Sequence, residues 1–345
     1  MRFLLSLTCA ATALSAQNVH IQPPGYAGVE GNSSTGIPFS YASARVHQAD
    51  SNRIGQPMPA ITALSWRRDR SAGASATART IDVTILMGKC DIAQFSATFA
   101  NNWLAPPTTV YTTKPTNLPD ISQAPPVPPA PFAVTIPLDV SFNYDGVDSL
   151  LWELQVDNGV TGTYSLDWSS GAATTSAPTS TQLGTGCTTP NGAMGLTTTF
   201  SATATALNLS FTVARGPSSA PVVLALGLAD PNLTLPGFCT AIRTDAIAQV
   251  PLGTTNTTGS LSGAVISAPW NDAFPGVVLF TQVLAPDASQ TGVPVALSDG
   301  RQSPLPLTSG GPAPTGVRRT YSTSSSSAPT GVAPSTSAVV TEIRY

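Results

Sequence analysis

Runs in which every second side chain is apolar recur along this 345-residue chain and limit it to β-structure. The alternation is clear in Ile61–Trp66, Ile81–Met87, Leu150–Val156 and Leu207–Val213. Successive side chains of a strand point to opposite faces of a sheet, so a period of two residues marks a half-buried strand. These runs predict strands along both halves of the chain.

Composition supports an all-β fold with long loops. The chain contains 32 prolines and 28 glycines, which interrupt it too often for long helices. Charged residues make up 10% of the chain, against about 25% in ordinary globular proteins. An apolar fraction of 41% with a net charge of -3 favours folding over disorder. Without basic runs, the sequence gives no reason to expect a nucleic-acid partner.

The first 16 residues have the pattern of a signal peptide. Met1 and Arg2 are followed by the apolar stretch Phe3–Leu14, and Ala16 precedes the expected cleavage before Gln17. No later stretch reaches the roughly 20 apolar residues of a membrane span. The sequence therefore predicts an exported protein, secreted or at the cell surface, without a transmembrane anchor.

The distribution of strands and linkers predicts two domains. We expect a β-sandwich or jelly-roll-like domain over residues 17–170 and a smaller β-domain over residues 183–306. Residues 171–182 are rich in Gly, Ala, Ser, Thr and Pro and are assigned as a linker. The proline-rich segment 114–131 is interpreted as a loop inside the first domain, because strand-like sequence resumes directly after it.

The C-terminal segment 307–345 is dominated by Ser, Thr, Pro and Gly. Such a segment cannot bury enough apolar surface to order itself, so disorder is the favoured prediction. The alternative is that Val339–Tyr345 adds a strand to a neighbouring sheet.

Three cysteines follow the expected signal peptide, which itself contains Cys9. In an oxidising compartment an odd number leaves one pair and one thiol. Cys187 and Cys239 are the best pair, because both belong to the predicted second domain and lie near glycine-containing turns. Their disulfide would stabilise the fold by about 4 kcal/mol. Cys90 is predicted to be a buried or lone thiol rather than a nucleophile.

No motif in the sequence indicates catalysis. The two histidines, His20 and His47, belong to no zinc-binding pattern, and no G-x-S-x-G turn presents a nucleophilic serine. Most acidic residues between 139 and 167 are expected to form turns. Asp145 and Asp148 are candidate ligands of a Ca²⁺ ion. The enzymatic alternative is a carbohydrate-active hydrolase that uses two carboxylates.

Five tryptophans make glycan binding the leading alternative to a purely structural role. Trp66 and Trp152 fall on the apolar phases of their strands and are predicted to be core residues. Trp103 and Trp270 lie in loop-like sequence, where exposed rings could stack on sugars. These two are the predicted ligand-binding residues.

Several separated motifs resemble secreted two-domain β-rich proteins of planctomycete-type bacteria whose activity is uncharacterised. The first resemblance covers roughly residues 30–168 and implies a β-sandwich-like exported domain. The second covers about residues 183–299 and implies a small β-domain in which Cys187 and Cys239 pair. No functional residues are carried over. The matching segments are Ile37–Phe39, Arg45–Gln48, Ile61–Asp69, Phe99–Asn102, Phe142–Asp145, LLWEL, GTGC, LGLAD, FCT and VVLFTQVLAPDA.

The sequence as a whole predicts an exported non-catalytic structural or adhesion protein whose partner is an extracellular glycan or surface component. A carbohydrate-binding module is the first alternative and a carbohydrate-active hydrolase the second. No cofactor is expected beyond the Ca²⁺ candidate.

Overall fold

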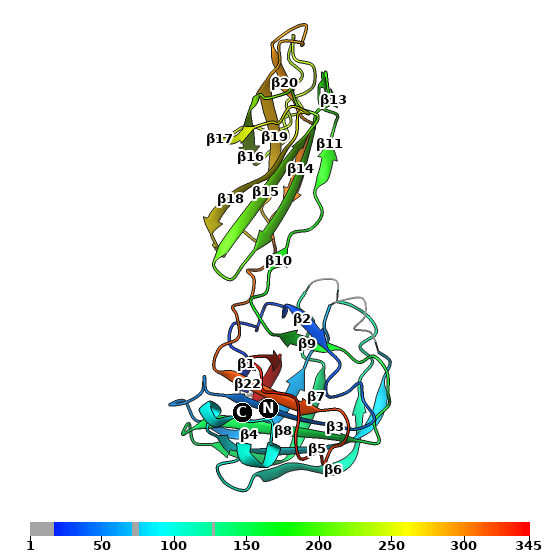
Figure 1. The fold of residues 1–345 in the computed structure, drawn as a ribbon, viewed down its shortest axis with the longest axis vertical. Helices are drawn as coiled ribbons and strands as arrows, with labels where there is room; N and C mark the ends of the chain where they lie inside the picture. Colours follow the sequence, from blue (N-terminus) through cyan, green and yellow to red (C-terminus); the bar gives the residue numbers. More distant parts are fainter. Residues whose placement is uncertain (1–16, 71–75, 126–127) are drawn as a thin grey trace, which may run out of the picture.

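The computed structural model describes residues 17–70, 76–125 and 128–345, and it is an all-β protein. Antiparallel sheets form two bodies along one long axis (Figure 1). We call the part with β1–β9 and β22–β24 the first body and the part with β10–β21 the second body. The described residues contain no α-helix, only the 3-10 turns η2 (Ile92–Gln94) and η3 (Phe99–Asn102). The predicted signal peptide, residues 1–16, lies outside the described residues.

Three sheets build the first body. A four-stranded sheet has the order β1-β24-β4-β7, a five-stranded sheet β22-β3-β8-β5-β6 and a small sheet β2-β9-β23. The strands are β1 (Val19–Gln22), β2 (Ser33–Thr35), β3 (Ala44–Asp50), β4 (Met58–Trp66), β5 (Arg79–Cys90), β6 (Thr108–Leu118), β7 (Val134–Tyr144), β8 (Ser149–Asp157), β9 (Leu166–Ser169), β22 (Val317–Ser322), β23 (Ala338–Val339) and β24 (Thr341–Arg344).

The core of the first body contains the side chains that the alternation assigned inward. Trp66 of β4 and Trp152 of β8 are fully buried, with ring centroids 6.0 Å apart. The four- and five-stranded sheets both contribute side chains to this apolar cluster. The prediction that Trp66 and Trp152 are core residues is therefore confirmed.

The prediction of a disordered C-terminal tail is wrong. Residues from 307 onward leave the second body and return to the first (Figure 1). They supply three strands of the first body, and β24 lies between β1 and β4 in its sheet. Val340 and Ile343 are fully buried, and the Gln48 side chain exchanges hydrogen bonds of 2.8 and 3.0 Å with the backbone of Val339. The segment needs no core of its own, because sheets built by earlier residues provide one.

The proline-rich segment 114–131 begins inside a strand. Lys114 and Pro115 belong to β6, where Pro115 is opposite Asp82 of β5. Since β6 is at the edge of its sheet, a proline there costs no hydrogen bond to a further strand. Beyond Leu118 the described residues form a loop that returns to β7, whereas residues 126–127 lie outside the description.

The second body has two larger sheets and a hairpin. Their strand orders are β10-β14-β15-β18, β11-β21-β19-β16-β17 with β20 paired to β19, and β12-β13. The strands are β10 (Thr175–Ser176), β11 (Thr181–Leu183), β12 (Thr188–Thr189), β13 (Gly192–Ala193), β14 (Gly195–Ala202), β15 (Ala206–Ala214), β16 (Pro221–Gly227), β17 (Ala248–Thr254), β18 (Leu261–Pro269), β19 (Val278–Pro286), β20 (Val295–Leu297) and β21 (Gly300–Pro304).

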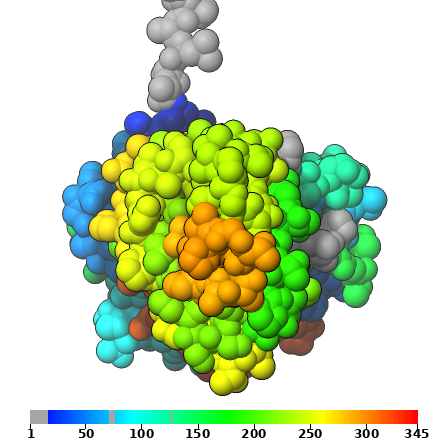
Figure 2. Space-filling model, turned by 90° about the horizontal axis from the view of Figure 1, so that it is seen from above, coloured from blue at the N-terminus to red at the C-terminus, as the bar shows by residue number. Residues whose placement is uncertain are grey.

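The second body has its own apolar core, to which Leu209, Phe211 and Val213 of β15 contribute as their alternation predicted. Two chain segments connect the bodies. A hydrogen bond joins these two segments, in which the Ala173 amide donates to the Gly311 carbonyl at 2.9 Å. Viewed along the long axis, the second body covers the centre of the molecule and parts of the first body show around its edge (Figure 2).

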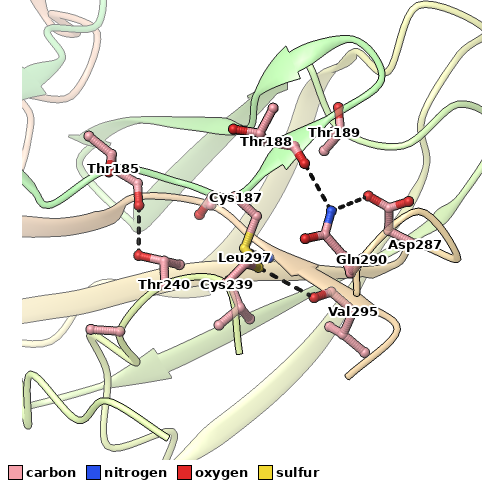
Figure 3. Close-up of a disulfide and its surroundings, with 12 residues drawn as sticks. Thr185, Cys187, Thr188, Thr189, Cys239, Thr240, Asp287, Gln290, Val295 and Leu297 are labelled. Atoms are coloured by element: carbon pink, nitrogen blue, oxygen red, sulfur yellow. Dashed lines mark hydrogen bonds between the residues drawn. A yellow bond between two sulfur atoms is a disulfide. The ribbon is translucent and has the colours of Figure 1, made fainter. Parts of the chain in front are cut away.

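Cys187 and Cys239 form a disulfide, as predicted (Figure 3). It joins the buried start of the β12–β13 region to the long connection between β16 and β17. Beside it, Thr240 Oγ1 donates to the Thr185 carbonyl at 2.7 Å and fastens the same connection (Figure 3). Cys90 is a buried free thiol, and burial raises its pKa to about 12, so it has little thiolate at neutral pH.

Candidate site at a buried unpaired arginine

The most unusual polar group of the first body is the guanidinium of Arg319 on β22. Arg319 is 2% exposed, although arginine is almost never fully buried without a partner. Its backbone is fixed on both sides: it is opposite Gln48 of β3, and it exchanges two 3.0 Å hydrogen bonds with Ser335. The tail that the sequence predicted as disordered therefore both carries and covers this side chain.

Two aromatic rings hold the guanidinium. Its central carbon lies 4.9 Å from the ring centroid of Tyr321 and 5.6 Å from that of Trp168. Such cation–π contacts favour a charged guanidinium without using its hydrogen-bond donors. Nε and Nη1 have no hydrogen-bond partner, and Nη2 makes only a long contact of 3.4 Å to Thr35 Oγ1.

The positive charge of Arg319 is not compensated. Within the part of the chain that the structure describes, it forms no ion pair with aspartate or glutamate. Burial lowers the pKa of Arg319 to about 10, so the side chain remains charged at neutral pH. An unpaired buried charge carries a large desolvation cost. We therefore expect the Arg319 guanidinium either to bind a ligand or to have another role that offsets this cost.

Arg319 lines a cavity of about 450 Å³, which we call the Arg319 cavity. Its volume falls in the range of small-molecule binding sites, roughly 300–1,000 Å³. The remaining wall combines hydroxyl groups with apolar and aromatic surface. The hydroxyls come from Thr35, Ser170, Ser335, Thr336 and Ser337, and the rest from Ile37, Trp168, Tyr321, Val332 and Ala333.

Strand geometry explains how Trp168 reaches the Arg319 cavity. On β9, Asp167 points to the opposite side, where its carboxylate pairs with Arg67 at 2.7 Å and accepts from the Gly31 amide at 2.7 Å. That buried pair fixes β9 next to β2, so Trp168 and Thr35 contribute to the same wall.

The predicted ligand-binding tryptophans lie elsewhere, and the structure does not bring them together. Trp103 is half-buried, and its ring packs 4.9 Å from that of His47 in the first body. Trp270 is half-buried in the second body, packs 5.7 Å from Phe274 and donates to Asp272 at 3.1 Å. Their role in binding stays a prediction.

The other candidate groups are occupied by internal partners. His47 is fully buried and bonds to Glu153, which Arg45 also contacts at 2.8 Å. His20 bonds to Asp50 at 2.7 Å. Lys89 lies 2.9 Å from Asp145 and 3.8 Å from Asp148, so an ammonium group occupies the place considered for Ca²⁺. Among the described residues, no three His, Cys, Asp or Glu side chains form a metal cluster.

Glu30 and Asp69 line another cavity, of about 260 Å³. Burial, together with the negative charges of Asp167 and Asp69, raises the pKa of Glu30 to about 7, and its Oε1 has no hydrogen-bond partner. The pKa of Asp167 is also raised, to about 6, because burial outweighs the Arg67 partner.

The contribution of Glu30 to stability should fall as the pH rises from about 4.5 to 7, whereas His47, whose pKa burial lowers, acts in the opposite direction. Glu30 binds its proton more tightly in the folded state, so this stabilisation is complete below the unfolded-state pKa and is lost through the folded-state pKa. Asp167 adds to the same trend. In a thermal-shift assay we expect the melting temperature of the wild type to fall by a few degrees between pH 5 and pH 8 relative to that of Glu30→Gln.

The matched variants for this pH dependence are Glu30→Gln and Glu342→Gln, because both glutamates are half-buried and Glu342 instead pairs with Arg344 at 2.6 Å. Glu30→Gln should flatten the fall in melting temperature, and Glu342→Gln should keep it. An unchanged slope in Glu30→Gln would contradict the assignment.

Sequence reasoning missed Arg319 because the tail appeared unable to fold. A signal was present, since Arg318 and Arg319 stand together in a segment otherwise poor in charge and are followed by Thr320 and Tyr321. Strand-forming residues around an arginine pair are atypical of a disordered Ser/Thr-rich tail.

Comparisons with known proteins add little. No protein-family model matches the chain, and no curated protein matches it. One solved structure, a β-1,2-glucanase from Parabacteroides distasonis, aligns with a TM-score of 0.16 and 8% identity, over 85% of this chain and 37% of that chain. A TM-score this low transfers neither fold nor activity. No helix among the described residues is long and apolar enough to cross a membrane.

Proposed function

We propose that this chain is an exported, non-catalytic adhesion protein that binds an extracellular carbohydrate in the Arg319 cavity. The observation that carries the proposal is a preformed cavity of about 450 Å³ whose wall holds hydroxyl groups, aromatic rings and one uncompensated cation. Its sandwich-like first body supplies the binding surface, and its smaller disulfide-linked second body extends away from it.

The chemistry of the wall fits a sugar. Hydroxyl side chains both donate and accept, so they can follow the hydroxyl groups of a pyranose ring. Trp168 and Tyr321, together with Ile37 and Val332, offer apolar surface to the C–H groups of the sugar ring. No aspartate or glutamate lines the Arg319 cavity, which favours binding over glycosidic hydrolysis there.

Two further observations support export. The Cys187–Cys239 disulfide is typical of proteins folded in an oxidising compartment. Low charge and many Ser and Thr residues also fit an extracellular protein without a nucleic-acid partner.

A bulky residue at the rim of the Arg319 cavity should block glycan binding. Ala333 is exposed and lines the cavity, so Ala333→Trp fills it without disturbing the core. Thr323→Trp adds the same bulk at an exposed tail position outside the cavity and is the matched control. On a glycan array with residues 17–345, Ala333→Trp should weaken binding at least about tenfold, roughly 1.4 kcal/mol, and Thr323→Trp should not.

The array also separates the alternatives. Binding that survives Ala333→Trp but is lost in Trp103→Ala/Trp270→Ala would contradict the proposed site. Release of reducing ends from bound polysaccharides would support the hydrolase instead. If the protein bound no glycan on the array, that result would contradict the carbohydrate proposal and favour a purely structural surface protein.

A further inference from the structure

We infer that the carbohydrate bound in the Arg319 cavity carries a carboxylate, as a uronic-acid residue does; this inference rests on the proposed function. A neutral sugar would leave the buried positive charge of Arg319 unpaired and would not explain why an arginine occupies the wall. A carboxylate would supply the missing counter-charge at the place where the structure has none.

The unused donors of Arg319 suit a planar two-oxygen acceptor. A guanidinium presents two edges, each with two parallel N–H groups, and Nη2 contributes one hydrogen to each edge. Thr35 takes at most one Nη2 hydrogen, while Nε and Nη1 have no partner. Whichever hydrogen Thr35 uses, one complete two-donor edge is therefore free. Such an edge matches the two oxygens of a carboxylate.

The surroundings strengthen an ion pair at this place. Arg319 is 2% exposed, so a carboxylate that reaches it is screened by solvent much less than it would be at the surface. The rings of Trp168 and Tyr321 flank the guanidinium and favour its charged form, to which a carboxylate binds. Ser335 and Ser337 bond to each other at 2.7 Å, whereas the hydroxyl group of Thr336 also lines the cavity and can meet the sugar ring.

Binding requires a small movement of the side chain. Nε and Nη1 are covered in the ligand-free arrangement, so the guanidinium has to turn toward the cavity to meet the carboxylate. The 3.4 Å contact with Thr35 is long and is easily given up in exchange for a charge-assisted bond.

Calorimetric titrations of residues 17–345 with paired probes test this inference. The probes are tetragalacturonate, tetramannuronate and tetraglucuronate, each beside its carboxyl-reduced neutral counterpart, and a sulfated galactose tetramer. We expect at least one acidic tetramer to bind about tenfold or more tightly than its reduced form. The sulfated probe supplies a tetrahedral anion for comparison, and the inference expects it to bind more weakly than that tetramer.

Two substitutions test whether Arg319 causes the preference for the acidic probe. Arg319→Met keeps length and removes charge, so it should retain the fold while losing the preference for the acidic probe; a thermal melt checks the fold. Arg319→Lys keeps the charge but loses the two-donor edge and should retain only part of the preference. The matched control is Arg318→Met on the same strand, where Arg318 is half-buried and outside the cavity.

The results that overturn the inference differ from those that overturn the proposed function. Equal binding of the acidic and neutral forms would overturn the inference that the bound sugar carries a carboxylate, and so would a preference for the acidic form that survives Arg319→Met. Either result would leave the proposal of glycan binding intact. Preference for the sulfated probe over every carboxylate would also overturn the carboxylate inference. No binding of any probe, together with a silent glycan array, would remove both.

Discussion

Replacing Ile343 by aspartate should unfold the first body. Ile343 is fully buried on β24, where it is opposite His20 of β1 and Leu64 of β4. The substitution removes about 2–3 kcal/mol of apolar burial and places a carboxylate in the core at a cost of several kcal/mol more. A total of about 5 kcal/mol or more approaches the whole stability of a typical domain. Denaturant unfolding followed by tryptophan fluorescence measures the loss.

The controls for Ile343→Asp separate burial from position. Ile343→Val removes one methylene and should cost about 1 kcal/mol. Arg344→Ala, at the neighbouring half-buried position, should cost less than Ile343→Asp by several kcal/mol. If Ile343→Asp melted like the wild type, β24 would not be a strand of this sheet.

The second large effect is expected from removing the disulfide. Cys187→Ala with Cys239→Ala frees a loop closed over a sequence separation of 52 residues, worth about 4 kcal/mol in the chain-entropy model. The bridge anchors residues 228–247, a connection with few buried side chains between β16 and β17. We therefore expect the second body to unfold at lower denaturant concentration, while the first body keeps its transition.

Reduction provides an independent check on the disulfide. Dithiothreitol should lower the stability of the wild type to that of the double variant and leave the variant unchanged. Cys90→Ala is the matched cysteine control in the first body, and it should respond to dithiothreitol as the wild type does. A double variant that unfolds at the wild-type denaturant concentration would contradict a stabilising role for the bridge.

Local alternation was sufficient to predict strands because it reports which face of each strand is buried. Trp66, Trp152 and Phe211 occupy the core positions that their periodicity assigned. The cysteine pair was also predictable, because Cys187 and Cys239 both fall in the predicted second domain, whereas Cys90 falls in the first.

The tail and the Arg319 cavity could not be predicted in the same way. The order of residues 317–344 comes from pairing with β3, β4 and β9, which lie far away in sequence, and no local pattern encodes those pairings. Arg319, Trp168 and Thr35 meet only after that pairing, so the sequence directed attention to Trp103 and Trp270.

A crystal structure of residues 17–345 grown with the acidic tetramer that binds most tightly would test the central claim most directly. We predict a uronate in the Arg319 cavity, with both carboxylate oxygens at hydrogen-bond distance from Arg319 and residues 332–337 still lining the cavity. A sugar bound instead at Trp103 or Trp270, with Arg319 still unpaired, would contradict the account.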